Sequence, residues 1–248
     1  MKIGIKRAGN ILKALAVSLP EWGRRPAVRR FRRAGDAEGE RKKIAEIEYR
    51  WSSRLFRTLK LNVQVEGSQN LPDQPCVLIA NHQSYFDVPC LLYAFGGRQL
   101  SFIADARFQR TPLIGSWIRY TKGLFIERGN TRESIKTLQE AGRMVKDGFS
   151  VAIFPEGTRS KGKPMKHFKA GSFKLATKGG FPILPAVLDG SWRFYEEKGY
   201  APAGASCKVT FLPVVETKDL SREEKAGIHL LIENQIRKAL GEEERAES

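Results

Sequence analysis

Cysteine and histidine are scarce in this sequence, and so are long apolar runs. Its 248 residues include three cysteines and three histidines. Cys76, Cys90 and Cys207 are scattered, odd in number and without C-x-x-C or Cys/His spacing. This pattern argues against a disulfide framework and against a zinc site. We expect three reduced cysteines in an apolar core, as is usual in a cytosolic compartment.

The sequence has no apolar run that approaches the roughly 18–20 residues of a membrane-spanning helix. A signal peptide is not indicated either, because the short apolar run 11–19 contains Lys13 and lacks a clear small-residue cleavage site. Any association with a membrane is therefore expected to be peripheral or monotopic.

Acidic residues are scarce at the start of the chain. Among residues 1–33, Glu21 stands alone against ten basic residues, so this segment carries more than half of the formal net charge of +16. The ten are Lys2, Lys6, Arg7, Lys13, Arg24, Arg25, Arg29, Arg30, Arg32 and Arg33. Apolar residues such as Ile5, Leu12 and Leu19 alternate in patches with these charges, which is typical of an amphipathic interfacial helix. The segment predicts binding to an anionic membrane surface from the cytoplasmic side; a solvated basic tail is the alternative.

Short strands alternate with helices in the rest of the chain. We expect strands at residues 63–65, 76–80, 101–104, 124–126, 151–154, 183–188 and 208–215. We expect helices at residues 39–59, 88–95, 113–120, 131–146, 167–177 and 221–240. This alternation predicts an α/β fold with a mixed, mostly parallel sheet flanked by helices.

The length fits one sizeable domain with an appendage. We expect a helical membrane-association segment at residues 1–60, a pair of helices in all. The catalytic domain would span 61–240, and a frayed, charged tail would span 241–248.

A histidine lies five residues before an aspartate, just after a predicted strand. Pro89 favours a helix that begins beside it, so we expect His82 in a strand-to-helix loop and Asp87 in the first turn of the helix. Backbone amides there favour a carboxylate, which can orient the imidazole as a general base for an alcohol. The alternatives are an ordinary N-cap with a loop histidine, and a nucleophilic Ser84, which lacks the G-x-S-x-G elbow.

A second candidate block, residues 154–160, follows the strand at 151–154. Its Gly157 permits close backbone approach, and Arg159 offers a bidentate fork for phosphate. Glu156 can hold either that fork or a substrate hydroxyl. Arg128 ends a predicted strand that we expect to be a neighbour, so two arginines would form an anion clamp; surface arginines on loops are the alternative.

Four short blocks thus follow one another over about 105 residues. They are N-H-x-S-x-x-D (Asn81, His82, Ser84, Asp87), G-x-x-F-I-x-R with one residue fewer between Gly and Phe (residues 123–128), F-P-E-G-T-R-S (residues 154–160) and P-I-x-P (residues 182–185). The chain resembles the glycerophosphate acyltransferase superfamily, and in particular its 1-acyl-sn-glycerol-3-phosphate acyltransferases. The blocks are specific for the superfamily and less specific for the acceptor lipid.

The resemblance implies transfer of an acyl group from acyl-CoA or acyl-carrier protein to the free hydroxyl of 1-acyl-glycerol 3-phosphate, making phosphatidic acid for phospholipid synthesis. His82 would deprotonate the hydroxyl with support from Asp87. The glycerol phosphate would be bound by Arg128, Glu156, Gly157, Thr158 and Arg159. The resemblance also implies a mixed α/β sheet, a two-helix membrane platform at the N-terminus, and no metal or other cofactor.

One segment departs from the family pattern. Where the family often shows Ala-Lys-x-Glu-Leu, this chain has Ala-Asp-Ala-Arg-Phe at residues 104–108. Asp105 and Arg107 invert the two charges, and whether Arg107 takes over the role of the lysine stays open.

Other functions remain as alternatives. Within the same class, the acceptor could be another lyso-lipid or glycerol 3-phosphate itself. A non-catalytic basic protein that binds a membrane or nucleic acid is a more remote alternative. We expect no nucleic-acid partner, because no helix-turn-helix, zinc finger or RNP signature is present and the excess charge is terminal.

Overall fold

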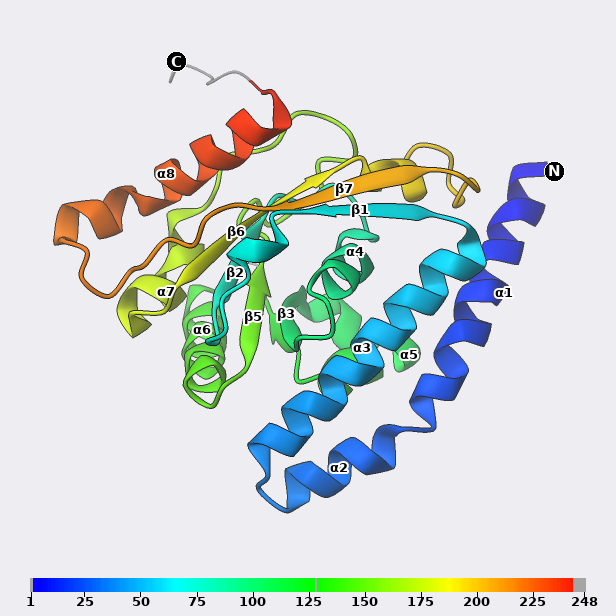
Figure 1. Ribbon diagram of the computed structural model, residues 1–248, viewed down its shortest axis with the longest axis horizontal. Coiled ribbons are helices and arrows are strands. Elements are labelled where there is room, and N and C mark those ends of the chain that lie inside the picture. Colours follow the sequence, from blue (N-terminus) through cyan, green and yellow to red (C-terminus); the bar gives the residue numbers. More distant parts are fainter. Residues whose placement is uncertain (1, 128, 243–248) are drawn as a thin grey trace.

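The computed structural model of this chain describes residues 2–127 and 129–242 (Figure 1). In these residues the α-helices are α1 (Lys2–Trp22), α2 (Arg25–Arg33), α3 (Ala37–Leu59), α4 (Asp87–Ala94), α5 (Pro112–Tyr120), α6 (Thr131–Lys146), α7 (Lys174–Gly179) and α8 (Arg222–Leu240). The strands are β1 (Asn62–Glu66), β2 (Val77–Ala80), β3 (Leu100–Asp105), β4 (Leu124–Ile126), β5 (Ser150–Ile153), β6 (Ile183–Asp189) and β7 (Ser206–Phe211). Short 3₁₀ helices include η2 (Ala106–Arg110), η3 (Ala170–Phe173) and η4 (Ser191–Phe194).

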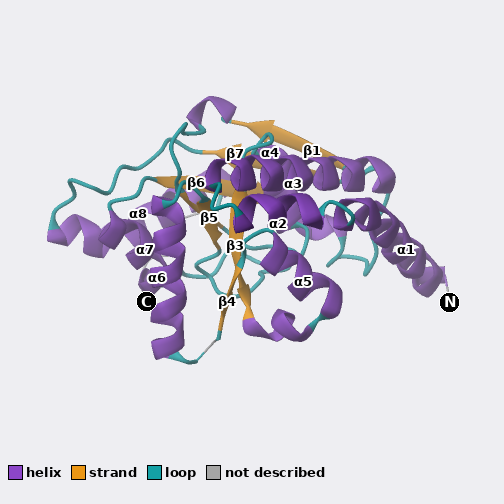
Figure 2. Ribbon diagram, turned by 90° about the horizontal axis from the view of Figure 1, so that it is seen from below, coloured by secondary structure: helices purple, strands orange, loops and turns teal. Residues whose placement is uncertain are grey.

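The strands of the described residues form one sheet in the order β1-β7-β6-β2-β5-β3-β4. The pair β6 and β7 is antiparallel and every other pair is parallel. Helices α3 and α4 cover one face, and α6, α7 and α8 cover the other, as Figure 2 shows in a view along the sheet. The predicted α/β fold with a mixed, mostly parallel sheet is confirmed.

The central strands owe their place to continuous apolar sequence. Every residue of β2 and β5 is buried, as expected of parallel strands that have helices on both faces. Successive side chains point to opposite faces, so Leu78 and Ala80 pack with the α3 and α4 side, while Val77 and Ile79 pack with the α6 to α8 side. The carboxyl end of this central pair is therefore a rigid platform.

Helix boundaries follow capping side chains. Asn130 accepts a hydrogen bond from the backbone amide of Glu133 at 3.1 Å and starts α6, which spans the residues predicted for it. Ser221 and Glu224 form a reciprocal capping box at the start of α8. Both helices cover the face of the sheet that is opposite α3 and α4.

The N-terminal appendage contains three helices, where the sequence predicted a pair. Helix α2 was missed because five of its nine residues are arginine and its apolar stripe is short, with Val28 and Phe31 at helical spacing. Helices α1 and α3 are joined through Glu21, a fully buried carboxylate that pairs with Arg54 at 2.9 Å and with Arg24 at 3.1 Å. The appendage is thus tied together by buried charge as well as by apolar contact.

Within residues 2–127 and 129–242, none of the helices combines the length and the apolar composition that crossing a membrane would require.

The predicted bounds of one helix and one strand differ from those observed. The helix predicted at 167–177 begins later than expected, because residues 170–173 form η3 and α7 begins at Lys174. Residues 167–169 precede both, since the backbone amide of Phe168 donates to Glu233 and that of Lys169 to Pro155. Strand β7 stops at Phe211, since Pro213 lacks the amide that a longer ladder needs.

The C-terminal end is ordered further than we expected. Glu242, assigned to the frayed tail, bonds Arg237 at 2.9 Å and the amide of Met165 at 3.1 Å. Residues 243–248 lie outside the described part of the chain.

Candidate active site

The candidate site lies where the carboxyl ends of β2 and β5 meet. The two strands are parallel neighbours, so the chain leaves both of them at the same edge of the sheet. After β2 it forms a loop that holds His82, and α4 then begins at Asp87. This is the strand-to-helix turn that the sequence predicted.

His82 and Asp87 are in direct contact. The imidazole Nδ1 lies 2.6 Å from Asp87 Oδ2. An ionised carboxylate accepts hydrogen bonds only, so this contact assigns the proton to Nδ1 and leaves Nε2 as the proton acceptor. The side chain of His82 is 19% exposed, whereas that of Asp87 is fully buried.

Asp87 is held by several donors. Its Oδ2 also accepts the backbone amides of Gln83 at 2.6 Å and Ser84 at 2.9 Å. Its Oδ1 accepts the hydroxyl of Ser191, which follows β6. A buried carboxylate with this many donors has its orientation fixed, and through it the imidazole is fixed as well.

The imidazole ring also rests on an aromatic side chain. The ring centroids of His82 and Phe154 are 4.1 Å apart and the planes differ by 15°, so the rings are stacked. Phe154 is the first residue after β5. The first and third sequence blocks are thus brought together by the pairing of β2 with β5 and by the stacking of His82 on Phe154.

Glu156 holds the backbone of the site. One carboxylate oxygen accepts the amide of His82 at 2.6 Å, and the other accepts the amide of Lys166 at 3.1 Å. The expectation that it could hold the Arg159 fork is not met, because Arg159 pairs elsewhere. Burial raises the pKa of Glu156 to about 7, and the two amide hydrogen bonds oppose that rise. A contact between Glu156 and a substrate hydroxyl stays a prediction.

The third block is further joined to the first by backbone hydrogen bonds. The amide of Ser160 donates to the carbonyl of His82 at 2.7 Å, and that of Lys161 donates to Gln83 at 3.1 Å. Gly157 adopts φ +68°, and Lys169 lies against the position where a Cβ would stand. Any larger residue at Gly157 would be strained there and would displace that lysine. Thr158 is half-buried beside it.

Arg159 is restrained on two sides. Its Nη1 lies 2.7 Å from Glu196 Oε1, and its guanidinium lies 3.4 Å from the centroid of the Tyr85 ring. Arg128, the other half of the predicted anion clamp, falls outside the described residues. We had expected the strands that precede Arg128 and Arg159 to be neighbours. This was wrong, because β3 lies between β5 and β4.

Ser84 does not pair with the histidine among the residues that the structure describes. Its hydroxyl donates to Glu196 and accepts the backbone amide of Phe86 at 3.0 Å. The contacts of Ser84 are those of a residue that fixes the loop, and the nucleophile alternative gains no support from them.

In the segment that departs from the family pattern, the side chain of Arg107 is turned outward. Arg107 is 80% exposed and pairs with Asp105, with Nε 2.9 Å from Oδ1 and Nη2 3.1 Å from Oδ2. Whether this arginine acts on the substrate stays a prediction.

Two residues of the site escaped sequence reasoning. Ser191 and Glu196 follow β6 and reach back to the first block. No motif marks them, because their spacing from His82 exceeds 100 residues and is set by the sheet order. The fourth block, residues 182–185, lies at the start of β6. The carbonyl of Pro182 accepts the backbone amide of Val77.

The fold and the site define an α/β protein in which a histidine at the end of a central strand contacts a buried carboxylate. No cluster of three or more His, Cys, Asp or Glu side chains suited to a metal ion is found in residues 2–127 and 129–242.

Comparison with known proteins gives the family. Residues 62–189 match the family model described as Acyltransferase. The chain is 30% identical over 181 residues to the 1-acyl-sn-glycerol-3-phosphate acyltransferase of Borreliella burgdorferi, covering 73% of this chain and 72% of that protein. It is 38% identical over 145 residues to the chloroplastic enzyme BAT2 of Brassica napus, covering 57% of this chain and 41% of that protein.

A solved structure agrees along the whole chain. The 1-acyl-sn-glycerophosphate acyltransferase PlsC from Thermotoga maritima aligns with a TM-score of 0.70 and 26% identity, covering 97% of this chain and 99% of that one. The chain belongs to the acyltransferase family.

Proposed function

We propose that this acyltransferase moves an acyl group from a thioester, acyl-CoA or acyl-carrier protein, to the free hydroxyl of 1-acyl-glycerol 3-phosphate, forming phosphatidic acid. The observation that carries the proposal is the contact of 2.6 Å between His82 Nδ1 and the buried Asp87 carboxylate. The relatives named for this reaction support the choice of acceptor.

The reaction follows from the tautomer of His82. Nε2 accepts the proton of the acceptor hydroxyl while the hydroxyl oxygen attacks the thioester carbonyl. Asp87 stabilises the imidazolium that forms. The tetrahedral intermediate collapses with cleavage of the carbon–sulfur bond, and the proton passes from His82 to the departing thiolate. The products are an ester and a free thiol, and no metal or other cofactor enters the balance.

Phosphate recognition is assigned to the third block. Arg159 supplies a guanidinium whose geometry matches phosphate oxygens. Gly157 lets the chain approach closely, and Thr158 stands between them with a hydroxyl. Arg128 is proposed as a second cation on the strength of its block alone.

The proposed function is tested by turnover of purified protein with palmitoyl-CoA or acyl-carrier protein and a panel of acceptors, with products identified by mass spectrometry. We expect the protein to form phosphatidic acid from 1-acyl-glycerol 3-phosphate. The rate of this reaction should not change after treatment with a chelator. The panel includes glycerol 3-phosphate, lysophosphatidylcholine and monoacylglycerol. Preference for any of these would overturn the acceptor assignment, and no acyl transfer to any acceptor, 1-acyl-glycerol 3-phosphate included, would overturn the reaction.

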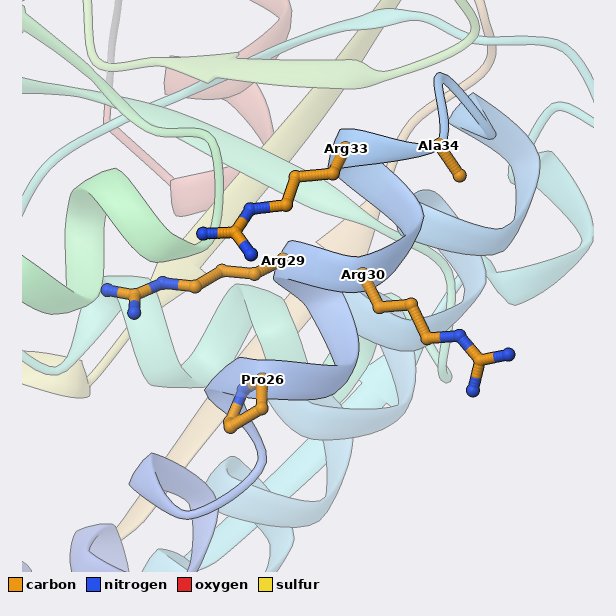
Figure 3. A pocket seen from close by; sticks show the side chains of 5 residues that line it. All are labelled: Pro26, Arg29, Arg30, Arg33 and Ala34. Carbon is orange, nitrogen blue, oxygen red and sulfur yellow. The ribbon is translucent and has the colours of Figure 1, made fainter.

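We further propose that the appendage places the protein on an anionic membrane surface, on its cytoplasmic side. Large apolar side chains of α1 are exposed, among them Ile5, Ile11, Leu12, Leu15 and Leu19. Arg29, Arg30 and Arg33 of α2 line a shallow pocket with Pro26 and Ala34, and Figure 3 shows Arg29 and Arg33 extending to one side of the helix. Apolar insertion together with basic residues near the headgroups suits such a surface.

Sedimentation with anionic liposomes tests this placement against the nucleic-acid alternative. We expect the protein to sediment with phosphatidylglycerol vesicles at physiological salt and to leave duplex DNA unbound. The reverse result would favour the basic nucleic-acid-binding alternative.

A further inference from the structure

Glu196 is a buried carboxylate that no sequence block marks and that the reaction scheme above does not use. It lies just after η4, between β6 and β7, and its side chain is 5% exposed. Its Oε1 accepts the Arg159 guanidinium at 2.7 Å and the Tyr85 amide at 3.1 Å. Its Oε2 accepts the hydroxyl of Ser84.

These partners belong to the two sequence blocks that build the site. Ser84 is in the first block and Arg159 is in the third. Glu196 thus joins, from a third segment, the loop that holds the base to the loop that holds the phosphate fork. Burying a carboxylate is costly unless its partners satisfy it, and here one cation and two further donors do so.

The guanidinium of Arg159 is restrained in two directions at once. Glu196 holds one of its nitrogens, and the Tyr85 ring lies against its face at 3.4 Å. A guanidinium has five N–H donors in a fixed plane, so fixing one end and one face fixes the direction of the others. Among the described residues no hydrogen bond is found for its Nε and Nη2. Those donors are therefore available to a ligand.

We propose that Glu196 is a positioning residue that orients Arg159 for the phosphate of the acceptor. The inference rests on the proposed function, because it takes the phosphorylated acceptor as the ligand of Arg159. Without Glu196 the long arginine side chain would regain its rotamer freedom, and the acceptor would have to fix it again on binding. Glu196 would therefore contribute to acceptor binding and would not affect the proton transfer at His82.

A competing role for Glu196 has the opposite sign. A carboxylate on Arg159 could occupy the position of the phosphate and be displaced by it. Removing the charge of Glu196 would then strengthen acceptor binding, since the cation would be freed. The direction of the change in KM separates the two roles.

The test compares Glu196→Gln with the wild type and with a matched control. Glutamine keeps the size and one acceptor oxygen but removes the charge that pairs with Arg159. Glu197→Gln makes the same substitution at the next residue, whose side chain is 40% exposed and pairs with Lys198 at 4.0 Å. We expect Glu196→Gln to raise KM for 1-acyl-glycerol 3-phosphate roughly tenfold, with kcat and KM for the thioester close to wild type. The control should keep all three values.

Two further measurements separate positioning from a general loss of structure. The midpoint of thermal unfolding reports the stability of each variant. In an Arg159→Ala background, Glu196→Gln should add no further change in KM, because its target is already absent. A lowered KM in Glu196→Gln, or equal loss with the phosphate-free acceptor monoacylglycerol, would overturn the proposal.

Failure of the proposed function would look different. Calorimetric titration with inorganic phosphate reports the Arg159 site without turnover, and we expect Glu196→Gln to weaken that binding while Glu197→Gln does not. If the wild type acylates another phosphorylated acceptor, the acceptor assignment fails and the phosphate titration still supports Glu196. If the wild type and Glu196→Gln bind phosphate equally, the positioning role is overturned whatever the acceptor.

Discussion

The candidate site and the appendage use charge in opposite ways. At the site, the carboxylates of Asp87, Glu156 and Glu196 are buried and each accepts at least two hydrogen bonds. On α2, the guanidinium groups of Arg29 and Arg33 are exposed and form no ion pair within the described residues. One region has buried charge held by hydrogen bonds, and the other has exposed charge without an ion-pair partner in the described residues.

The difference fits the ligand that each region would meet. Proton transfer needs an imidazole within hydrogen-bond reach of one hydroxyl, so its supports must not move. An anionic surface offers many headgroups, and exposed arginines gain from attraction to all of them without a fixed geometry. Substitutions should therefore have sharp, site-specific effects in the first region and graded, salt-dependent effects in the second.

The largest effect is expected from His82→Ala. Removal of a general base lowers kcat by about 10²–10⁴. The ring is 19% exposed and stacks on Phe154, so its loss should also lower stability. Steady-state kinetics should show lost turnover with unchanged liposome binding, and thermal unfolding should show that the variant is still folded at the assay temperature. Wild-type turnover in this variant would remove the base assignment.

The next effect concerns Glu156 and pH. Its pKa is raised from 4.5 to about 7 by burial, so the stabilisation it contributes is fully present below pH 4.5 and is lost as pH rises through 7. Between pH 5 and pH 8 the wild type should lose free energy of unfolding relative to Glu156→Gln, on the order of 3 kcal/mol. Urea denaturation at the two pH values measures this difference.

Glu38→Gln is the control for that comparison. Its exposed carboxylate has its pKa lowered by the neighbouring Lys42, so its titration lies below the chosen window. The stability difference between this variant and the wild type should be the same at pH 5 and pH 8. A wild type that does not weaken relative to Glu156→Gln would contradict the assignment of a raised pKa to Glu156.

The smallest effect is expected from Arg29→Gln/Arg33→Gln. Each basic residue near an anionic leaflet contributes about 1 kcal/mol, so the pair should weaken liposome binding roughly thirtyfold and lower its salt dependence. The control Lys174→Gln/Lys178→Gln removes the same charge from exposed positions on α7. Equal losses in both double variants would mean that net charge, and not the α2 surface, governs the binding.

Much of the fold could be predicted from local patterns. The boundaries of α6 follow Asn130 and Gly148, and the buried strands β2 and β5 read as apolar runs. The His82 and Asp87 pair was predictable because both residues lie within one strand-to-helix turn. In each case the determining interactions lie close together in the sequence.

The remaining features depend on contacts between distant segments. Sequence spacing could not reveal that Glu196 takes the Arg159 fork, since the two are 37 residues apart and meet only through the sheet order. Nor could it place Glu156 on the amide of His82, because backbone donors carry no sequence signal. Helix α2 was hidden by its arginines, because only a short apolar stripe, Val28 and Phe31, lies between them.

Helix α1 also touches the segment that carries Glu196. Asn10 donates to the carbonyl of Ala201 at 3.3 Å, and Arg7 lies 5.9 Å from the centroid of the Tyr195 ring. Lys6 lies 5.1 Å from the centroid of the Tyr200 ring. If α1 lies on a membrane as proposed, the same helix contacts the segment that carries Glu196, so membrane binding and acceptor binding would be coupled through that segment.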